Sequence, residues 1–261
     1  MSTRPVALIT GASAGLGEQF AHLFARDGYD VVLVARSAAR LEPVAERLRH
    51  HKINAIVLAE DLAQPGAAGR LYDAVKAKGL EVSFLVNNAG YGSTGEFLDL
   101  PVEKEAEMVQ LNCTALLELS HRFGHEMRAR KNGRILNIAS TAGFQPGPYM
   151  ATYYASKAFV LSFSEALAHE LKDSGVTVTC HCPGPTATAF PARAGNDTSR
   201  LFQQPGIAKS EDVAAHAYEA MMQGEVVSVH GLLNWALTQS VRFSPRAVVR
   251  SIAAAVNSRP E

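Results

Sequence analysis

Short apolar runs alternate along the chain with longer segments in which apolar residues recur every three or four positions. The runs are apolar throughout, which is typical of strands in a parallel sheet that helices cover on both faces. We therefore expect seven strands, near 5–10, 30–35, 54–59, 82–90, 133–140, 176–182 and 225–230.

The segments between these runs have the spacing of amphipathic helices, with Leu16, Phe20 and Phe24 as the first example. The spacing predicts helices near 15–28, 38–51, 64–78, 101–130, 151–173 and 210–222. Alternating strands and helices imply an α/β fold with a doubly wound, right-handed parallel sheet. No linker or internal repeat divides the chain, so we expect a single domain over 1–261.

Two segments depart from this regularity. Residues from about 185 to 209 are rich in Pro, Gly, Ser and Thr, which predicts a lid-like substrate loop. Residues from about 231 to 257 are expected to form a helical extension, with Val248, Val249, Ile252 and Val256 along one stripe. That stripe favours packing on the core or on another subunit, and a membrane-surface role is the alternative.

Charge and cysteine content narrow the functional classes. Lys plus Arg and Asp plus Glu number 25 each, so nothing favours nucleic acid as a partner. Cys180 and Cys182 flank His181 in an expected strand, where buried cysteines are a better interpretation than metal ligands, and we expect no metal. No apolar run is long enough to span a bilayer and no signal peptide is evident, so we expect a cytoplasmic protein.

A glycine-rich turn joins the first strand to the first helix. In the sequence TGASAGLG, Gly11, Gly15 and Gly17 allow a tight turn and a close approach of the backbone to a phosphate. The helix N-terminus beyond them favours a pyrophosphate, and the Ser13 hydroxyl adds a donor. The position of the turn, between strand and helix, predicts a dinucleotide cofactor.

The end of the second strand indicates which dinucleotide. An NAD site would carry an acidic residue there, whereas this chain has Arg36, with Arg40 one turn further on. A guanidinium suits the 2′-phosphate of NADP(H), because it donates two parallel hydrogen bonds to an anion. Two solvated arginines at a helix start are the alternative.

A tyrosine and a lysine lie on neighbouring faces of one predicted helix. Tyr153 and Lys157 project about 40° apart, so the ammonium is able to lower the pKa of the phenol and make it a proton donor. Tyr154 lies three residues before Lys157, so helix geometry alone does not separate the two tyrosines.

Together, the glycine turn, the NNAG sequence at 87–90 and the Tyr153-x-x-x-Lys157 pair resemble the short-chain dehydrogenase/reductase family. The resemblance implies a Rossmann-type seven-stranded sheet with helices on both faces. It is nearest to ketoacyl-reductase and 17β-hydroxysteroid-dehydrogenase-like members, and it selects Tyr153 as the acid–base residue. It adds Ser140, with Thr141 as a weaker candidate, and Asn112, which would support a water near Lys157. The implied catalytic residues are Asn112, Ser140, Tyr153 and Lys157.

The resemblance also implies cofactor contacts. Asp61 is expected at the adenine amino group, although without the family it would be interpreted as the N-cap of the next helix. Asn87 is expected near the adenosine and ribose, with a structural role between strand ends as the alternative. The full expected set is Gly11, Ser13, Gly15, Leu16, Gly17, Arg36, Arg40, Asp61, Leu62, Asn87, Ala89, Gly90, Tyr153, Lys157, Pro183, Gly184, Thr186 and Thr188.

The sequence therefore predicts an NADP(H)-dependent oxidoreductase that interconverts a hydrophobic ketone or aldehyde and its alcohol. The expected pocket walls, 91–97, 143–150 and the lid, are largely apolar, which leaves 3-oxoacyl, steroid-like and aromatic substrates open. A non-catalytic NADP-binding sensor of the same fold is the alternative function. By the family resemblance, the helices near 101–130 and 151–173 are expected to form a homodimer or homotetramer.

Overall fold

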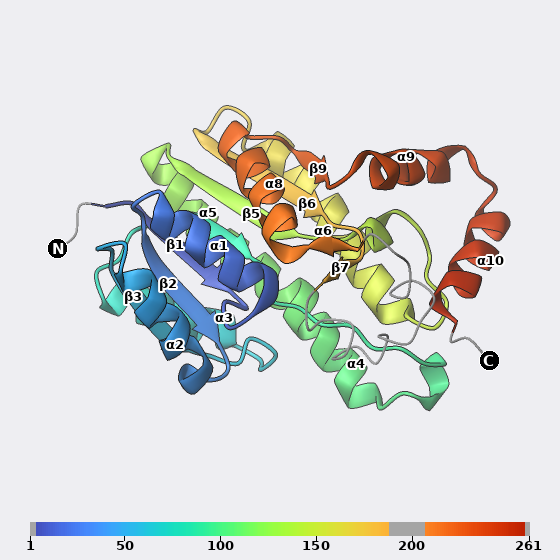
Figure 1. Ribbon diagram of the computed structural model, residues 1–261, viewed down its shortest axis with the longest axis horizontal. Helices are drawn as coiled ribbons and strands as arrows, with labels where there is room; N and C mark the ends of the chain where they lie inside the picture. Colours follow the sequence, from blue (N-terminus) through green and yellow to red (C-terminus); the bar gives the residue numbers. More distant parts are fainter. Residues whose placement is uncertain (1–3, 188–206, 259–261) are drawn as a thin grey trace.

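Seven parallel strands form the centre of the computed structural model, which describes residues 4–187 and 207–258 (Figure 1). The strand order is β3-β2-β1-β4-β5-β6-β9, and every neighbouring pair is parallel. The strands are β1 (Val6–Thr10), β2 (Asp30–Ala35), β3 (Ala55–Ala59), β4 (Val82–Asn87), β5 (Gly133–Ile138), β6 (Val176–Cys182) and β9 (Val227–Val229). The predicted doubly wound sheet is confirmed.

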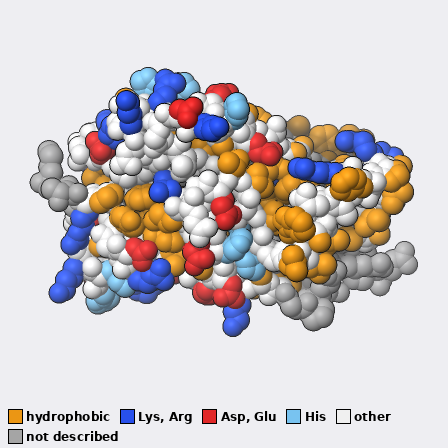
Figure 2. Space-filling view, turned by 90° about the horizontal axis from the view of Figure 1, so that it is seen from above, with side chains coloured by type: hydrophobic (Ala, Val, Ile, Leu, Met, Phe, Trp, Pro, Cys, Tyr) orange, Lys and Arg blue, Asp and Glu red, His pale blue; other side chains and the backbone are white. Residues whose placement is uncertain are grey.

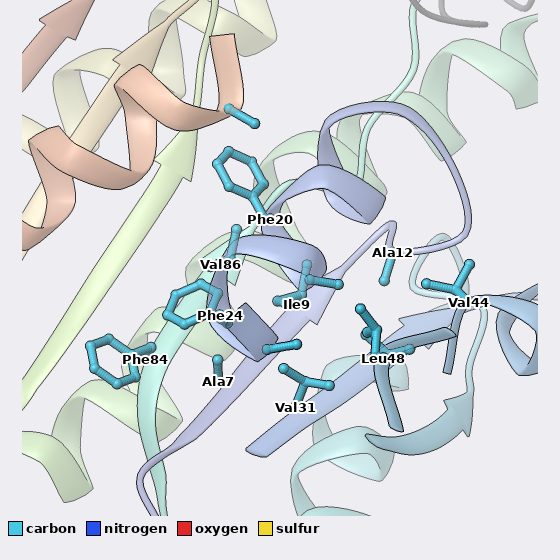
Figure 3. Close-up of a cluster of buried hydrophobic side chains, with 14 of the residues drawn as sticks. Ala7, Ile9, Ala12, Phe20, Phe24, Val31, Val44, Leu48, Phe84 and Val86 are labelled. Carbon is cyan, nitrogen blue, oxygen red and sulfur yellow. The ribbon is translucent and has the colours of Figure 1, made fainter. Parts of the chain in front are cut away.

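Helices cover both faces of this sheet. The helices are α1 (Gly15–Arg26), α2 (Ala38–Arg49), α3 (Ala67–Ala77), α4 (Val102–Val109), α5 (Leu116–Arg130), α6 (Ala151–Glu170), α8 (Ser210–Gln223), α9 (Leu232–Ser240) and α10 (Arg246–Asn257). In β1, Ile9 packs with α1, α2 and α8, whereas Leu8 packs with α3 and α5. Figure 3 shows the first of these clusters, with Phe20 and Phe24 of α1 above the strands. Burial on both faces explains why the strands are apolar throughout.

The order of the strands reverses between β1 and β4. After β1 the chain builds outward through β2 and β3, and it then returns to place β4 on the other side of β1. The carboxyl ends of β1 and β4 therefore diverge at a switch point, which is where open α/β sheets bind ligands.

Two expected helices differ from the prediction. The region expected as one helix over 101–130 is interrupted by a π-helical segment, Gln110–Ala115, between α4 and α5. The C-terminal extension is two helices: α9 ends at Ser240, a short 3-10 turn over Val241–Phe243 follows, and α10 begins after Pro245, its N-cap residue. The domain covers only part of the stripe expected on α10: Val249 is buried, whereas Val248 and Ile252 are 50% and 59% exposed.

A short pair of strands joins the two described ends of the predicted lid loop. Strand β7 (Thr186–Ala187) pairs in parallel with β8 (Ala208–Lys209), so Ala187 and Lys209 lie side by side. Most of the predicted lid, together with Thr188, lies outside the described residues. Among the helices of the described chain, none has both the length and the apolar character needed to cross a bilayer.

Buried amides tie the centre of the sheet together. Asn87 Nδ2 donates to Asn137 Oδ1 at 2.9 Å across the β4–β5 pair, and also to Ser120 Oγ of α5 at 3.0 Å. Asn137 Nδ2 then donates to Ser164 Oγ of α6 at 2.9 Å. These bonds join two strands to α5 and to α6, which carries Tyr153 and Lys157.

Replacing Asn137 tests this network. Asn137→Ala should lower the free energy of unfolding by about 2 kcal/mol, because two buried polar partners each lose a hydrogen bond. Urea denaturation would measure the change. The control Asn132→Ala removes an exposed amide and should change stability by less than about 0.5 kcal/mol. Equal effects of the two substitutions would contradict the structural role of the network.

Candidate active site

The glycine turn after β1 has the backbone geometry that requires glycine. Gly11 and Gly15 have φ values of +68° and +59°, in the left-handed region. A Cβ at Gly17 would lie 2.3 Å from the Gly11 carbonyl oxygen, so helix α1 is able to approach the turn only because position 17 has no side chain. The turn leads directly into the N-terminus of α1, where Ala14 is the N-cap residue and no side-chain cap is present.

This N-terminus points its first amide groups toward the end of the sheet. The backbone N–H groups of the first helical turn lack intrahelical partners and carry a partial positive charge. Ser13 and Leu16 are both partly exposed there, and Leu16 packs against the core below. The turn therefore offers donors suited to an anionic group.

Threonine and asparagine side chains hold the ends of β1 and β4 together. Thr10 Oγ1 accepts hydrogen bonds from the backbone N–H groups of Asn88 and Ala89, each at 3.0 Å. Asn88 Nδ2 donates to the Thr10 carbonyl at 2.9 Å. Both residues belong to the sequence motifs described above, but the motifs did not indicate this role. Their effect is to fix the segment 88–90 beside the glycine turn.

The residues expected near the adenosine lie at two places, with Arg36 and Arg40 after β2 and Asp61 and Leu62 after β3. Arg36 and Arg40 are exposed at the end of β2 and the start of α2, and within the described chain neither side chain forms an ion pair. Asp61 Oδ1 accepts from Ala63 N at 3.2 Å, which caps a turn; Gly66, not Asp61, is the N-cap residue of α3. Leu62 is buried.

Asn87 is buried and takes part in the hydrogen-bond network of the sheet. It is 4% exposed, and its amide nitrogen donates to Ser120 and Asn137. The alternative interpretation of this asparagine, as a tie between strand ends, is the one that the geometry supports. Ala89 and Gly90 remain at the switch point.

Lys157 projects from α6 into the end of the sheet. Its Nζ donates to the Ile138 carbonyl of β5 at 2.8 Å and lies 5.7 Å from the centroid of the Tyr153 ring. The lysine is 6% exposed, and burial lowers its pKa to about 8. A Cβ on Gly90 would come within 3.6 Å of Nζ, so a glycine at position 90 leaves room for the ammonium.

Tyr153 and Ser140 meet at the same point. Burial raises the pKa of Tyr153 well above its usual value, while a hydrogen bond with Ser140 acts to lower it. Ser140 Oγ also accepts from Ala142 N at 3.1 Å at the start of the short helix η3 (Thr141–Phe144). Burial is the largest influence on the pKa of Tyr153 in this structure.

Asn112 lies in the π-helical segment and bridges two parts of the site. Its Nδ2 donates to the Tyr91 carbonyl and to Ser156 Oγ, both at 3.0 Å, and its Oδ1 accepts from Tyr91 N at 3.2 Å. These bonds connect the segment after β4 to helix α6. A π-helical turn at such a position is frequent at functional sites.

The two adjacent tyrosines have different partners. Tyr154 is buried, and its hydroxyl donates to Asn257 Oδ1 of α10 at 3.1 Å. Asn257 Nδ2 in turn donates to the Pro148 carbonyl at 3.0 Å. Tyr154 is therefore a packing residue that holds the C-terminal helix, and nothing in the local sequence pointed to Asn257 as its partner.

The segment after β6 lies against Ser140 and the C-terminal region. The Pro183 carbonyl accepts from Thr141 N at 2.9 Å, and a Cβ on Gly184 would come within 2.5 Å of Asn234 Nδ2. Thr186 Oγ1 donates to the Gly184 carbonyl at 2.9 Å. Pro183, Gly184 and Thr186, which are expected near the nicotinamide, thus lie together after β6. The fourth expected residue, Thr188, lies outside the described residues.

Two expected substrate walls contact each other near the catalytic residues. Gly95 N donates to the Tyr149 carbonyl at 2.9 Å, which joins the loop 91–97 to the segment 143–150. Tyr149 has φ of +65°, an unusual conformation for a bulky residue and one that clusters at functional sites. Tyr149 is exposed here, whereas Met150 is buried beside Tyr153 and Phe144 packs against a core cluster.

The residues present fit a phosphorylated dinucleotide. The turn at Gly11 and Gly17 has no room for side chains, the amides at the start of α1 lack a side-chain cap, and Arg36 is exposed beside them. A tyrosine, a lysine and a serine meet at the end of the same crevice. A cofactor that lay across the switch point would have phosphate donors at one end and a proton donor at the other.

Comparisons with known proteins identify the family of this chain. The family model described as short chain dehydrogenase matches residues 5–199. A very-long-chain 3-oxoacyl-CoA reductase from Phaeosphaeria nodorum is 39% identical over 181 residues, which are 67% of this chain and 52% of that protein. The chain thus spans about half the length of this relative.

Solved structures agree over nearly the full length. A short-chain dehydrogenase from Sphingobium yanoikuyae in complex with NADPH superposes with a TM-score of 0.82 at 33% identity, covering 92% of this chain and 94% of the other. A bulky-bulky ketone specific alcohol dehydrogenase from Comamonas testosteroni gives a TM-score of 0.78 at 30% identity, with 93% of each chain covered. By its family match, its sheet and its active-site geometry, the chain belongs to the short-chain dehydrogenase family.

Proposed function

We propose that the protein is an NADP(H)-dependent oxidoreductase that interconverts an apolar ketone or aldehyde and its secondary or primary alcohol. The observation that carries the proposal is the buried Lys157 ammonium 5.7 Å from the centroid of the Tyr153 ring, with Ser140 bonded to the same tyrosine. The phenol of Tyr153, the ammonium of Lys157 and the hydroxyl of Ser140 thus lie close together beside the expected cofactor site.

Each of the three groups has a distinct task in the reduction. NADPH, when bound, supplies the hydride. Tyr153 donates its proton to the carbonyl oxygen as negative charge develops there. Ser140 orients that oxygen by a hydrogen bond, and its own position is fixed by Ala142 N.

Lys157 makes the proton transfer easier by its charge. With its pKa near 8, its ammonium is mostly protonated at neutral pH and favours the phenolate form of Tyr153. Asn112 holds α6 and the segment after β4 in register, which keeps the lysine beside Gly90. We propose that it also supports a water that connects Lys157 to solvent.

The proposed cofactor contacts follow from the crevice. The amides at Gly11 to Gly17 and Ser13 would hold the pyrophosphate, and Arg36 with Arg40 would hold the 2′-phosphate. Asp61 and Leu62 would border the adenine, and Pro183, Gly184, Thr186 and Thr188 the nicotinamide. A related structure contains NADPH, which supports the choice of the phosphorylated dinucleotide.

The substrate is proposed to be large and apolar. We propose that Tyr149, which is exposed, and the largely apolar segment 143–150 border the substrate. Relatives described as acting on very-long-chain 3-oxoacyl-CoA and on bulky-bulky ketones support this class. Within it, 3-oxoacyl, steroid-like and aromatic carbonyl compounds are the candidates. The non-catalytic sensor gains no support, because the four catalytic residues gather at one site.

We also propose a cytoplasmic homodimer or homotetramer. The helices expected at the subunit contact carry exposed apolar side chains, Val109 at 44%, Leu117 at 39% and Phe159 at 37%. The three cysteines are buried and unpaired, as suits a reducing compartment.

The adjacent tyrosines provide a matched test of the mechanism. Tyr153→Phe should lower kcat by about 1,000-fold, since general acid catalysis contributes 10²- to 10⁴-fold, while NADPH affinity stays within about twofold. Tyr154→Phe keeps the acid and should lower kcat by less than about tenfold. Steady-state kinetics with an aromatic ketone and NADPH fluorescence titration measure both effects. Wild-type turnover in Tyr153→Phe would refute the assignment.

The arginine at the end of β2 tests the choice of cofactor. Arg36→Ala should weaken NADPH binding by about 10- to 100-fold, because a hydrogen bond between charged groups is lost, and should leave NADH binding nearly unchanged. Fluorescence titration with both nucleotides gives the comparison within one variant. Equal losses for the two nucleotides would show that Arg36 does not bind the 2′-phosphate.

Apolar residues on α4 and α5 test the assembly. Val109→Glu with Leu117→Glu should shift the sedimentation equilibrium of the protein toward the monomer, because two charges would be buried in each copy of the contact. The control Val226→Glu changes a similarly exposed valine, 44% exposed, on another surface and should leave the mass unchanged. A monomeric wild type, or an unchanged mass in the double variant, would contradict the proposal.

A further inference from the structure

The C-terminal arm, defined as α9, η4 (Val241–Phe243) and α10, exposes an unusual amount of apolar surface. Leu232 and Leu233 at the start of α9 are 81% and 73% exposed, and Phe243 in the turn is 88% exposed. Leu237, Val248 and Ile252 continue this exposure along both helices. Contiguous exposed apolar side chains of this size mark interaction surfaces rather than ordinary protein surface.

The arm packs against the catalytic domain by one face. Thr238 of α9 and Val249 and Ala253 of α10 are the buried residues of that face. Asn257, 1% exposed, bonds to the Tyr154 hydroxyl and the Pro148 carbonyl. The apolar side chains therefore point outward from a docked element. Figure 2 shows hydrophobic side chains gathered at the end of the molecule where Figure 1 places α9 and α10, with basic side chains at the edge.

The charge of this segment is one-sided although the chain as a whole is neutral. Between Val226 and Ser258 the sequence contains three arginines, Arg242, Arg246 and Arg250, and no aspartate or glutamate. All three arginines are exposed, and Arg246 with Arg250 follows the apolar turn at Phe243. Exposed large apolar residues combined with arginines and no acids are the composition of helices that lie on anionic bilayers.

We propose that the C-terminal arm docks this protein on the surface of a membrane that contains anionic phospholipids. Leu232, Leu233 and Phe243 would enter the boundary between headgroups and acyl chains, and Arg242, Arg246 and Arg250 would bind phosphate groups. This is attachment to the surface of the bilayer and is distinct from the subunit contact proposed on α4 and α5. It does not depend on the proposed catalytic function.

Charge distinguishes the membrane from a second copy of the chain. In a two-fold contact through the arm, the same basic patch lies on both sides, and neither side brings an opposite charge from this segment to the arginines of the other. No acidic residue in 226–258 is available to neutralise them. An anionic bilayer neutralises all three arginines and also accepts apolar side chains spread over two helices and a turn.

Co-sedimentation of the full chain with vesicles tests the proposal. Vesicles of equal parts phosphatidylcholine and phosphatidylglycerol should bind the protein, and phosphatidylcholine vesicles should bind it much more weakly. Substitution of Arg242, Arg246 and Arg250 by Gln should reduce binding to the anionic vesicles by roughly a hundredfold. The control substitution of Lys78, Arg128 and Lys172 by Gln removes three exposed charges elsewhere and should preserve binding within about threefold.

The apolar side chains have their own variants. Leu232, Leu233 and Phe243 changed together to Ser should reduce binding by at least about tenfold, since less apolar surface enters the bilayer. The control changes Leu98, Val102 and Val226 to Ser, which are 90%, 64% and 44% exposed elsewhere, and should bind as the wild type does. Circular dichroism checks that each variant is folded, and if the apolar variant is not, the arginine variant decides.

Three results would overturn the proposal: no binding to anionic vesicles at low salt, equal losses in the arm and control variants, or binding that ignores phosphatidylglycerol content. If instead the arm variants convert an oligomer into a monomer in sedimentation experiments without any vesicle binding, the arm is a subunit contact and the membrane proposal is wrong. Vesicle binding requires no turnover, so failure of the proposed catalytic function would be seen separately.

Discussion

A lysine buried against a tyrosine ring is the constraint on which the site depends. An ammonium taken out of water is costly unless polar groups surround it, and the Ile138 carbonyl at the end of β5 supplies one of them at 2.8 Å. A glycine at position 90 lets this segment approach Asn112, because a Cβ there would lie 3.0 Å from Asn112 Oδ1. Lys157 therefore stays protonated and beside Tyr153 only while the strand ends, the π-helical turn and α6 keep their relative positions.

The parallel sheet brings this lysine to the same edge as the glycine turn. All strands end at one edge, so residues that follow β1, β4, β5 and β6 become neighbours although they are far apart in sequence. Thr10 and the Asn87–Asn137 pair fix the spacing between those ends. Phosphate donors and a proton donor thus lie at one edge of the sheet, where the loop 91–97 and the segment 143–150 also contact each other.

The sequence was informative where chemistry depends on local pattern. Apolar runs located the strands, and Gly11 and Gly17 marked a turn whose positive φ and close packing only glycine accommodates. Long-range contacts left no such signal: the bond from Tyr154 to Asn257 joins residues 103 positions apart. On α10, periodicity showed which residues are apolar but not which of them the domain covers. The pKa of Tyr153 depends on burial, which spacing does not reveal.

The central claim is hydride transfer to an apolar carbonyl at the Tyr153–Lys157 site. The most direct measurement uses NADPH deuterated at C4 on one face or the other of the nicotinamide ring, with a bulky aromatic ketone, and mass spectrometry of the product. The account predicts deuterium on the carbinol carbon from only one of the two labelled cofactors. An unlabelled alcohol from both, or no alcohol from any apolar ketone despite NADPH binding, would contradict it.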